Sequence, residues 1–243
     1  MQLSTRALAI LFLSGCANPD WRTADRSSSG IAPLPKESQE AIAQVYCARA
    51  FRWRKYFAVH CWLASKEKNA NHYTTFHVIG WRLKSARSAV VIEKDIPDRK
   101  WYGAEPFLVQ GLRGAAAERA IPKIKAAVDS YPYHSQYRAW PGPNSNTFVS
   151  HILRSVPEFG VELPPHAIGK DWLKNSNLIG ITESGTGGQL SIFGLLGATV
   201  GLAEGIEVNV LGMSFGIDLW RPALKLPFLG RLGFKDAPIR DPN

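Results

Sequence analysis

The sequence predicts an α+β fold in which an antiparallel sheet packs against helices. The chain has 243 residues, of which 45% are apolar, so it is long enough to bury a large core. Its 21 glycines and 16 prolines indicate many turns and argue against a helical bundle. Strand-like runs fill the first half of the chain, and helically spaced apolar residues follow them.

The first residues are typical of a bacterial export signal. Arg6 supplies a positive charge, and residues 7–13 form an apolar run that is too short to span a bilayer. The run ends in Leu13-Ser14-Gly15-Cys16, which resembles the bacterial lipobox. That resemblance implies removal of residues 1–15 and diacylation of Cys16, which would anchor the protein in the cell envelope, facing the periplasm. An ordinary signal peptide with an accidental cysteine, or an uncleaved anchor, is the alternative.

Composition divides the remainder of the chain into three parts. Residues 16–40 are polar and turn-rich, which predicts a flexible tether, and a single α+β domain is expected over residues 41–234 with a tail at 235–243. The formal charge of +9 suggests an acidic neighbour such as anionic lipid. The basic residues are scattered and match no base-reading pattern, so we expect no nucleic-acid partner. Nothing indicates a metal or a cofactor, and the oligomeric state is left open.

The first half of the domain is predicted to be a meander of strands. Residues 45–50 and 56–64 form a hairpin around the basic turn at residues 52–55, because both runs are rich in β-branched and aromatic residues. Further strands are expected at residues 73–83 and 89–93. Cys47 and Cys61 lie on the two arms of the hairpin, so an oxidising compartment would permit a disulfide if the register brings them together.

Helices are expected next. Residues 105–130 show helical spacing, but Pro122 predicts two helices or a kinked one. The turn at residues 141–148 then leads into a helix that ends near Pro157, with Asn144 or Ser145 as its cap. The residues expected on the buried face of this helix are Phe148, Val149, Ile152, Leu153 and Val156.

The C-terminal part contains two apolar runs, at residues 190–202 and 206–220, joined by Ala203-Glu204-Gly205. They predict a long apolar β-hairpin that either covers the core or presents a lipid-facing surface, and we expect core packing for a run so rich in glycine. Residues 221–243 space their basic residues between prolines, which predicts an extended surface segment.

Ser145 is the candidate nucleophile. It stands at the positive end of a predicted helix dipole, where a developing anion is favoured, with Asn144 and Asn146 beside it as oxyanion or site-shaping residues. A serine hydroxyl needs a base, and His60 is the best candidate because it lies in an otherwise apolar strand. His77, on the next strand, could hydrogen-bond His60 and fix its tautomer. The simpler interpretation makes Ser145 a helix cap, His60 a core histidine and His77 an ordinary strand residue.

Several segments between residues 45 and 234 resemble DUF-3750, a bacterial family of unknown function. The resemblance covers most of the mature chain but names no reaction. The segments that carry it are Phe57-Ala58-Val59-His60, Val78-Ile79-Gly80-Trp81, Trp101-Tyr102-Gly103, Trp140-Pro141-Gly142-Pro143-Asn144-Ser145-Asn146-Thr147-Phe148 and Ala223-Leu224-Lys225-Leu226-Pro227.

A second resemblance suggests chemistry. Asn144-Ser145-Asn146-Thr147-Phe148 is similar to the Asn-Cys-Asn-x-Phe signature of PPPDE-type peptidases, which are permuted papain-like enzymes related to the lecithin:retinol acyltransferase group. The resemblance implies a permuted papain-like domain with Ser145 in the cysteine position and His60 as the catalytic histidine. Because a hydroxyl ionises far less readily than a thiol, a serine version needs a stronger base and oxyanion site, or has lost catalysis.

These observations together predict an envelope lipoprotein that acts as a serine-nucleophile hydrolase or acyltransferase on a lipid, acylated or peptide substrate. The basic charge and the apolar hairpin favour a lipid or acylated substrate. The alternative is a non-catalytic envelope protein that keeps the fold for binding or for a structural role.

Overall fold

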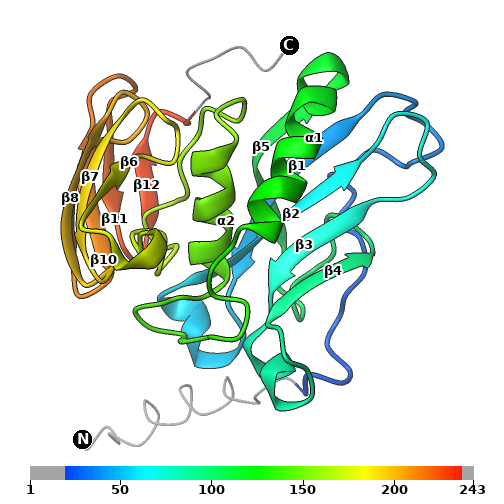
Figure 1. The fold of residues 1–243 in the computed structure, drawn as a ribbon, viewed down its shortest axis with the longest axis horizontal. Coiled ribbons are helices and arrows are strands. Elements are labelled where there is room, and N and C mark those ends of the chain that lie inside the picture. Colours follow the sequence, from blue (N-terminus) through cyan, green and yellow to red (C-terminus); the bar gives the residue numbers. More distant parts are fainter. Residues whose placement is uncertain (1–19, 237–243) are drawn as a thin grey trace, which may run out of the picture.

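The computed structural model describes residues 20–236, and within this range it contains two antiparallel sheets, two α-helices and three short 3-10 helices (Figure 1). The α+β class is therefore confirmed. The expected export signal, Cys16 and the end of the tail lie outside the described residues. No helix in the described range is both long enough and apolar enough to cross a bilayer.

The first sheet has the strand order β4-β3-β2-β1-β5. Its hairpin of β1 and β2 confirms the first two predicted strands, and the register places Cys47 directly opposite Cys61. The two sulfur atoms form a disulfide, so the register brings the two cysteines together as the predicted bond requires. The strands are β1 (Ile42–Arg49), β2 (Val59–Lys66), β3 (Thr74–Val78), β4 (Val90–Lys94) and β5 (Pro106–Arg113).

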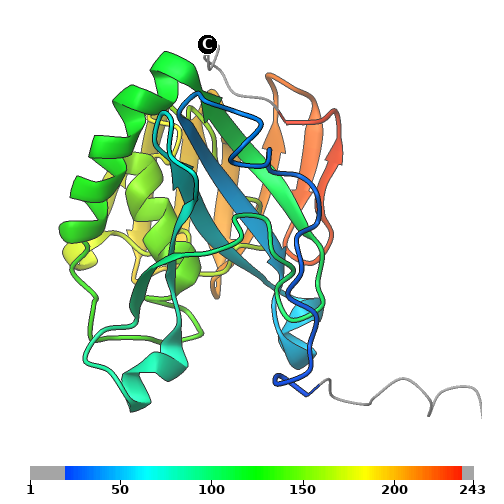
Figure 2. The same cartoon turned by 90° about the vertical axis from the view of Figure 1, so that its right-hand side faces the viewer.

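Both helices, α1 (Gly114–Asp129) and α2 (Ser145–Ser155), cover one face of this sheet (Figure 2). The prediction of helix from residue 105 was wrong, because β5 first completes the sheet beside β1. Of the two alternatives expected at Pro122, separate helices are not found, because α1 continues through this residue. Proline has no backbone N–H, so one carbonyl of the preceding turn loses its helical hydrogen bond. Because Pro122 is exposed, this carbonyl lies on the side of α1 that faces water.

The opposite face of the first sheet is covered by the segment expected to be a tether. Ile31 and Ala32 pack against the apolar cluster on this face, and both backbone N–H groups donate to the Asp98 carboxylate, at 2.6 and 3.1 Å. The Tyr73 hydroxyl donates to the Pro33 carbonyl at 2.9 Å. Residues 28–33 are therefore packed on the domain, and the expectation of a flexible tether does not hold for them (Figure 2).

The second sheet follows α2 and is an antiparallel meander of seven strands within the described chain. The expected long hairpin was wrong, because each apolar run itself folds back once. Phe193 and Gly194 in one turn, and Leu211 and Gly212 in another, have positive φ and produce tight reversals. The strands are β6 (Ile179–Ile181), β7 (Gly187–Ile192), β8 (Leu196–Gly201), β9 (Gly205–Val210), β10 (Met213–Asp218), β11 (Ala223–Leu226) and β12 (Gly230–Gly233).

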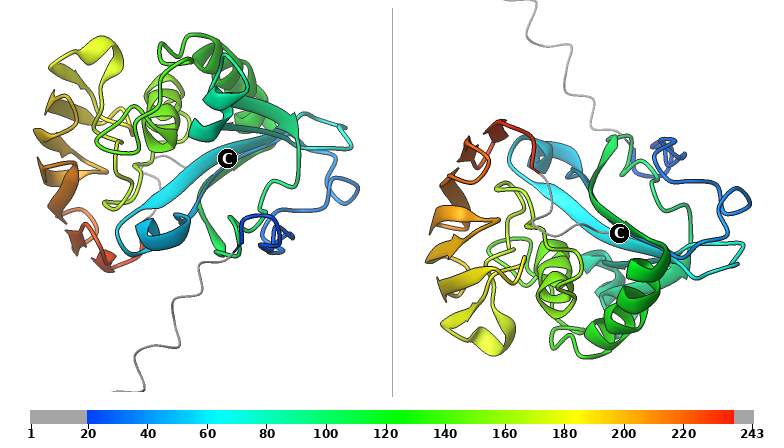
Figure 3. Two further views of the ribbon diagram at one scale, coloured as in Figure 1. Left: turned by 90° about the horizontal axis from the view of Figure 1, so that it is seen from below. Right: turned by 90° about the horizontal axis from the view of Figure 1, so that it is seen from above.

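Strands β11 and β12 also correct the prediction for the tail. Leu224 pairs with Leu232 and Ile217, so residues 223–233 extend the sheet where an extended surface segment was expected. Figure 3 shows the strands arranged in an arc that bows away from α2, which lies between the two sheets (Figure 1).

The second sheet turns its polar face inward and its apolar face outward, which reverses the expectation that its apolar residues cover the core. The buried face meets charged groups of the loop that precedes the sheet. Lys170 donates to Glu207 at 2.6 Å, and Lys225 donates to Glu207 at 3.1 Å and also to Glu162. Because these ions are paired and hydrogen-bonded, they tolerate burial where an apolar strand face would leave them without partners.

Candidate functional site

A cavity of about 690 Å³ opens at one end of the first sheet. The strand ends meet there: β1 ends, β2 begins and β3 ends at its walls, and α2 begins at its side. Ser145 and His60 both line this cavity, as do Asn144 and Asn146. The structure therefore gathers most of the residues singled out in the sequence around one hollow.

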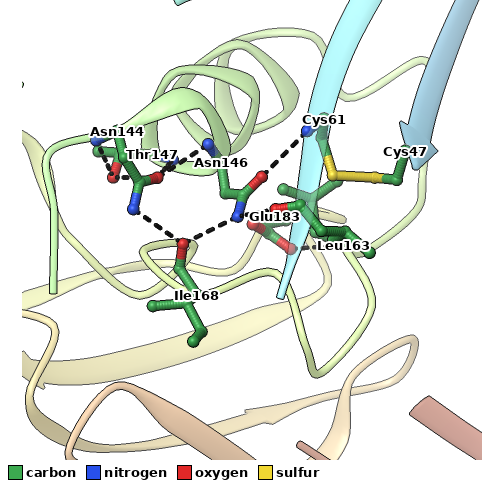
Figure 4. Close-up of a disulfide and its surroundings, with 9 residues drawn as sticks. Cys47, Cys61, Asn144, Asn146, Thr147, Leu163, Ile168 and Glu183 are labelled. Atoms are coloured by element: carbon green, nitrogen blue, oxygen red, sulfur yellow. Dashed lines mark hydrogen bonds between the residues drawn. A yellow bond between two sulfur atoms is a disulfide. The ribbon is translucent and has the colours of Figure 1, made fainter. Parts of the chain in front are cut away.

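The first turn of α2 is held by a reciprocal cap. The Asn144 side-chain oxygen accepts from the backbone N–H groups of Asn146 and Thr147, at 2.9 and 3.2 Å (Figure 4). The Thr147 hydroxyl accepts from the Asn144 backbone N–H in return, at 3.1 Å. The Asn144 amide nitrogen donates to the Ala139 and Ile168 carbonyls. Asn144, and not Ser145, is thus the helix cap.

Asn146 connects the start of α2 to the backbone on either side of His60. Its oxygen accepts from the Cys61 N–H at 3.1 Å, and its nitrogen donates to the Val59 carbonyl at 3.0 Å and to the Ile168 carbonyl at 2.9 Å (Figure 4). The side-chain amides of both asparagines are therefore committed to the backbone. They shape the site, and neither amide is free to donate to an oxyanion.

Ser145 is the first residue of α2 and is buried at the cavity wall. Within the described range, no hydrogen bond joins its hydroxyl to another residue, in contrast to Ser150 of the same helix, whose hydroxyl donates to the Lys170 carbonyl at 2.7 Å. The Ser145 hydroxyl is therefore not used for capping or for packing polar groups.

His60 approaches the cavity from the other face of the sheet. Val59 and Cys61 belong to the core beneath the helices, so the alternation of β2 directs His60 to the face that carries Trp62. The His60 ring stacks on Trp101 with centroids 3.7 Å apart and planes 9° from parallel. No hydrogen bond links its imidazole to the Ser145 hydroxyl among the residues described, although both residues line the cavity.

Burial keeps the two strand histidines neutral. The pKa of His60 is lowered well below its usual 6.5, first by burial and then by the nearby His77 and Arg99. Burial also lowers the pKa of His77, although Glu93, whose carboxylate lies 3.7 Å from the ring nitrogen, partly opposes this shift. The two rings are 6.0 Å apart and tilted, and the expected hydrogen bond between them is not formed in this structure. The buried Nε2 of His60 has no hydrogen-bond partner among residues 20–236.

Aromatic side chains form the wall that His60 contacts. Trp101 contacts Trp81 as well as His60, and the centroids of the two indole rings are 6.2 Å apart. The Tyr102 ring meets both indoles edge-on. Tyr102 has φ of +52°, and Arg52, also at the wall, has φ of +61°. Left-handed backbone at non-glycine residues is costly and concentrates at functional sites, so this wall is built at the expense of local strain.

Three basic side chains, Arg52, Arg54 and Lys84, line the same cavity, and no acidic residue is among its described lining residues. Within residues 20–236 no ion pair joins any of the three to a carboxylate. The sequence showed residues 52–55 only as a basic turn. Trp81 and Trp101 lay in segments of family resemblance, but nothing local indicated that they would meet.

The chemistry of the site is thus that of a basic, aromatic cavity with a free serine hydroxyl and a neutral imidazole. Among the described residues, no group of histidine, cysteine and carboxylate side chains has the arrangement needed to hold a metal ion. The protein is an α+β protein with an open, ligand-sized cavity at one end of its first sheet.

The chain belongs to the family described as "Protein of unknown function (DUF3750)", whose model matches residues 40–172. This confirms the family resemblance found in the sequence, except for the segment at residues 223–227, which lies outside the match. The match spans the first sheet, both helices and the loop that carries Lys170, and it ends before the second sheet begins. No curated protein and no solved structure matches the chain.

Proposed function

We propose that this protein binds, in the cavity beside α2, an anionic ligand with an aromatic or otherwise apolar body. One observation carries the proposal: Arg52, Arg54 and Lys84 line a cavity walled by indole rings and free of acidic residues among those described. A cation without a carboxylate partner gains most from an anionic ligand, and indole faces contribute apolar contact and stacking. The volume of about 690 Å³ suits a small molecule.

The proposed location is the bacterial cell envelope, with a lipid anchor at Cys16 on the periplasmic side. The disulfide between Cys47 and Cys61 supports an oxidising compartment, because such bonds are rare in the reducing cytosol. The Leu13-Ser14-Gly15-Cys16 motif supports the anchor. A Cys16→Ser variant should be held less firmly by membranes and should change its electrophoretic mobility, and unchanged behaviour on both counts would contradict the anchor.

Binding is tested by calorimetric titration of the purified protein with 1-naphthyl phosphate, and with 1-naphthol as the neutral analogue. We expect the phosphate to bind and the alcohol to bind much more weakly. An Arg54→Gln variant should bind the phosphate about tenfold more weakly, which is the loss expected for one charge-assisted hydrogen bond.

The matched control is Lys68→Gln, because Lys68 is an exposed lysine beyond the opposite end of β2. It should leave the affinity unchanged. Equal affinities for phosphate and alcohol, or equal losses in the Arg54 and Lys68 variants, would contradict the binding proposal.

A second candidate function is hydrolysis or acyl transfer on a permuted papain-like domain. It is favoured because Ser145 and His60 both line the cavity, and in the described part of the chain neither the serine hydroxyl nor Nε2 of His60 has a hydrogen-bond partner. In this reaction the Ser145 oxygen attacks a carbonyl carbon, and its proton passes to Nε2 of His60. His60 gives that proton to the leaving group as the acyl–Ser145 ester forms. Water, or an acceptor alcohol or amine, then attacks the ester and passes its proton to His60, which returns it to the Ser145 oxygen as the acyl–Ser145 bond breaks.

The geometry sets two demands on this second candidate. The His60 ring must leave its stack on Trp101 to reach Ser145. Backbone N–H groups must supply the oxyanion donors, because the amides of Asn144 and Asn146 are engaged. Binding without chemistry makes neither demand, and for that reason it is the preferred function.

Labelling with a fluorophosphonate probe separates the two candidates. Catalysis predicts a phosphonate adduct on Ser145 that is lost in both Ser145→Ala and His60→Ala and retained in Ser155→Ala, a serine at the exposed end of the same helix. A protein that binds naphthyl phosphate but shows no adduct at Ser145 is a binding protein.

A further inference from the structure

The outer face of the second sheet is apolar across every strand. On β7, β8 and β9 the buried positions are polar or glycine, and the alternate, solvent-facing positions carry aliphatic side chains or small residues. The aliphatic and aromatic residues on this face that are between 41% and 75% exposed are Ile179, Ile181, Leu190, Ile192, Leu196, Val200, Ile206, Val208, Val210, Phe215, Ile217, Leu224 and Leu232. We call this set the outer apolar face.

The strand register makes the outer apolar face continuous. Ile181, Gly188, Val200, Ile206, Ile217, Leu224 and Leu232 are successive cross-strand partners from β6 to β12. A second row runs beside it through Ile179, Leu190, Ala198, Val208 and Phe215. No charged or polar side chain interrupts either row, so the apolar residues form one patch.

The outer apolar face is larger than an ordinary surface patch. Its side chains expose roughly 1,000 Å², whereas the largest apolar patch on a typical monomer is about 300–600 Å². The turns at both ends of the sheet extend it, with Phe193 50% exposed at one end and Leu219 67% and Trp220 68% exposed at the other. An apolar surface of this size favours a partner that removes it from water.

Two observations identify the partner as lipid. The strands form an arc that bows outward, so the apolar face is convex (Figure 3). Two convex faces meet only along a narrow strip, which disfavours a face-to-face dimer, whereas fluid acyl chains conform to a curved surface. The charges are compatible with this partner: Glu183, Glu204, Glu207 and Asp218 are buried, whereas Arg221 is partly exposed and Lys235 is exposed together with one carboxylate, that of Asp236.

We propose that the outer apolar face docks on an anionic phospholipid bilayer, with the sheet lying in the plane of the membrane surface. A strand of six residues is about 20 Å long, which is shorter than the hydrocarbon core of about 30 Å, so strands of this length do not span the membrane and the sheet instead lies along one leaflet. The basic side chains at its rim then meet anionic head groups. This inference stands apart from the ligand proposed for the cavity.

The test places a fluorophore on the face. In the full chain with Cys16→Ser, the remaining two cysteines are joined in the disulfide, so an added cysteine is labelled selectively. The polarity-sensitive dye NBD is attached at Val208→Cys, in the middle of the face, and for comparison at Ile92→Cys on β4. The two positions are 48% and 54% exposed in the protein without lipid. Vesicles of phosphatidylcholine with phosphatidylglycerol are then added.

Lipid docking predicts a blue shift and several-fold brightening at position 208, with quenching by nitroxide-labelled lipid and no such change at position 92. The response should weaken with pure phosphatidylcholine. Vesicle-bound protein whose dye at 208 stays in water, as it does at 92, would overturn the proposal. A blue shift at 208 that grows with protein concentration without vesicles would identify a second copy as the partner and would also overturn it.

Substitution supplies an independent measure. Val208→Asp should reduce co-sedimentation with the anionic vesicles at least about tenfold, because an aspartate is strongly disfavoured in apolar lipid. Ile92→Asp should not reduce it. Both side chains are exposed, so both variants should keep the wild-type melting temperature, and unchanged vesicle binding of a folded Val208→Asp protein would refute the assignment.

Discussion

Replacing Asn146 tests whether this residue is a structural connection or part of a catalytic site. In Asn146→Ala, the buried Cys61 N–H and Val59 carbonyl lose the partners that the amide supplies, whereas the Ile168 carbonyl keeps its bond from Asn144. A buried unsatisfied group costs about 1–3 kcal/mol, so the two together predict a loss of about 4 kcal/mol. For a domain of this size, that corresponds to a fall in Tm of about 10 °C.

Asn146→Asp adds a pH dependence with a defined sign. The carboxylate still accepts from Cys61, but its second oxygen faces the Val59 and Ile168 carbonyls. Burial beside two carbonyl oxygens raises the folded-state pKa of the new carboxyl above its unfolded value of about 3.9. The variant should therefore be least destabilised below about pH 4 and should lose stability as pH rises through the raised folded-state pKa.

The assay is thermal unfolding of wild type and variants from pH 4 to 8, with Asn177→Ala as an exposed asparagine control. An Asn146→Ala protein as stable as the control would refute the structural role. So would an Asn146→Asp protein whose difference from wild type does not change with pH.

Three further predictions concern the elements around the cavity. Gly169→Ala should lower stability by at least about 2 kcal/mol in a denaturant titration, because Gly169 has φ of +98° and a Cβ there would overlap the helix cap at Asn144. Gly188→Ala is the control and should change stability little, because a Cβ at that position has no described atom within 4 Å. Cys47 and Cys61 are 14 residues apart in sequence, so reducing their disulfide should lower the free energy of unfolding by about 3 kcal/mol. Equal denaturation midpoints with and without reductant would contradict this stabilisation. Burial lowers the pKa of His166 to about 4. The free energy of unfolding of the wild-type protein should therefore fall as pH drops from 6.5 to about 4. Unfolding measured at these two pH values should show that His166→Gln loses up to about 3 kcal/mol less than wild type.

Local pattern was sufficient for the elements whose partners are close in sequence. The β1–β2 hairpin followed from two β-rich runs around a short turn, and α2 followed from a rigid turn before helically spaced apolar residues. At β5 the pattern misled, because residues 106–113 carry no strong alternation and gain their structure by pairing with β1, about 60 residues earlier in the chain.

The orientation of the second sheet could not be predicted from its own strands. Alternation shows that one face is apolar and the other polar, but which face is buried depends on what packs against it. Lys170 and Glu162 come from the preceding loop and draw Glu207 and Lys225 inward. Without the fold, an apolar face is assigned to the core by default.

The candidate site was predicted in part. Ser145, His60 and the two asparagines were found because a motif and an apolar strand singled them out, and the structure brings all four to one cavity. The basic and aromatic walls were missed because they combine strand ends and loops that are distant in sequence. The predicted contact of Ser145 with His60 stays a prediction.

The most direct test of the central claim is a crystal structure of the protein with 1-naphthyl phosphate. The cavity described above predicts the phosphate within hydrogen-bond distance of Arg52, Arg54 or Lys84, and the naphthyl ring against Trp81. A structure in which the cavity holds no ligand at saturating concentration, or in which the phosphate binds away from these three side chains, would contradict the proposed function.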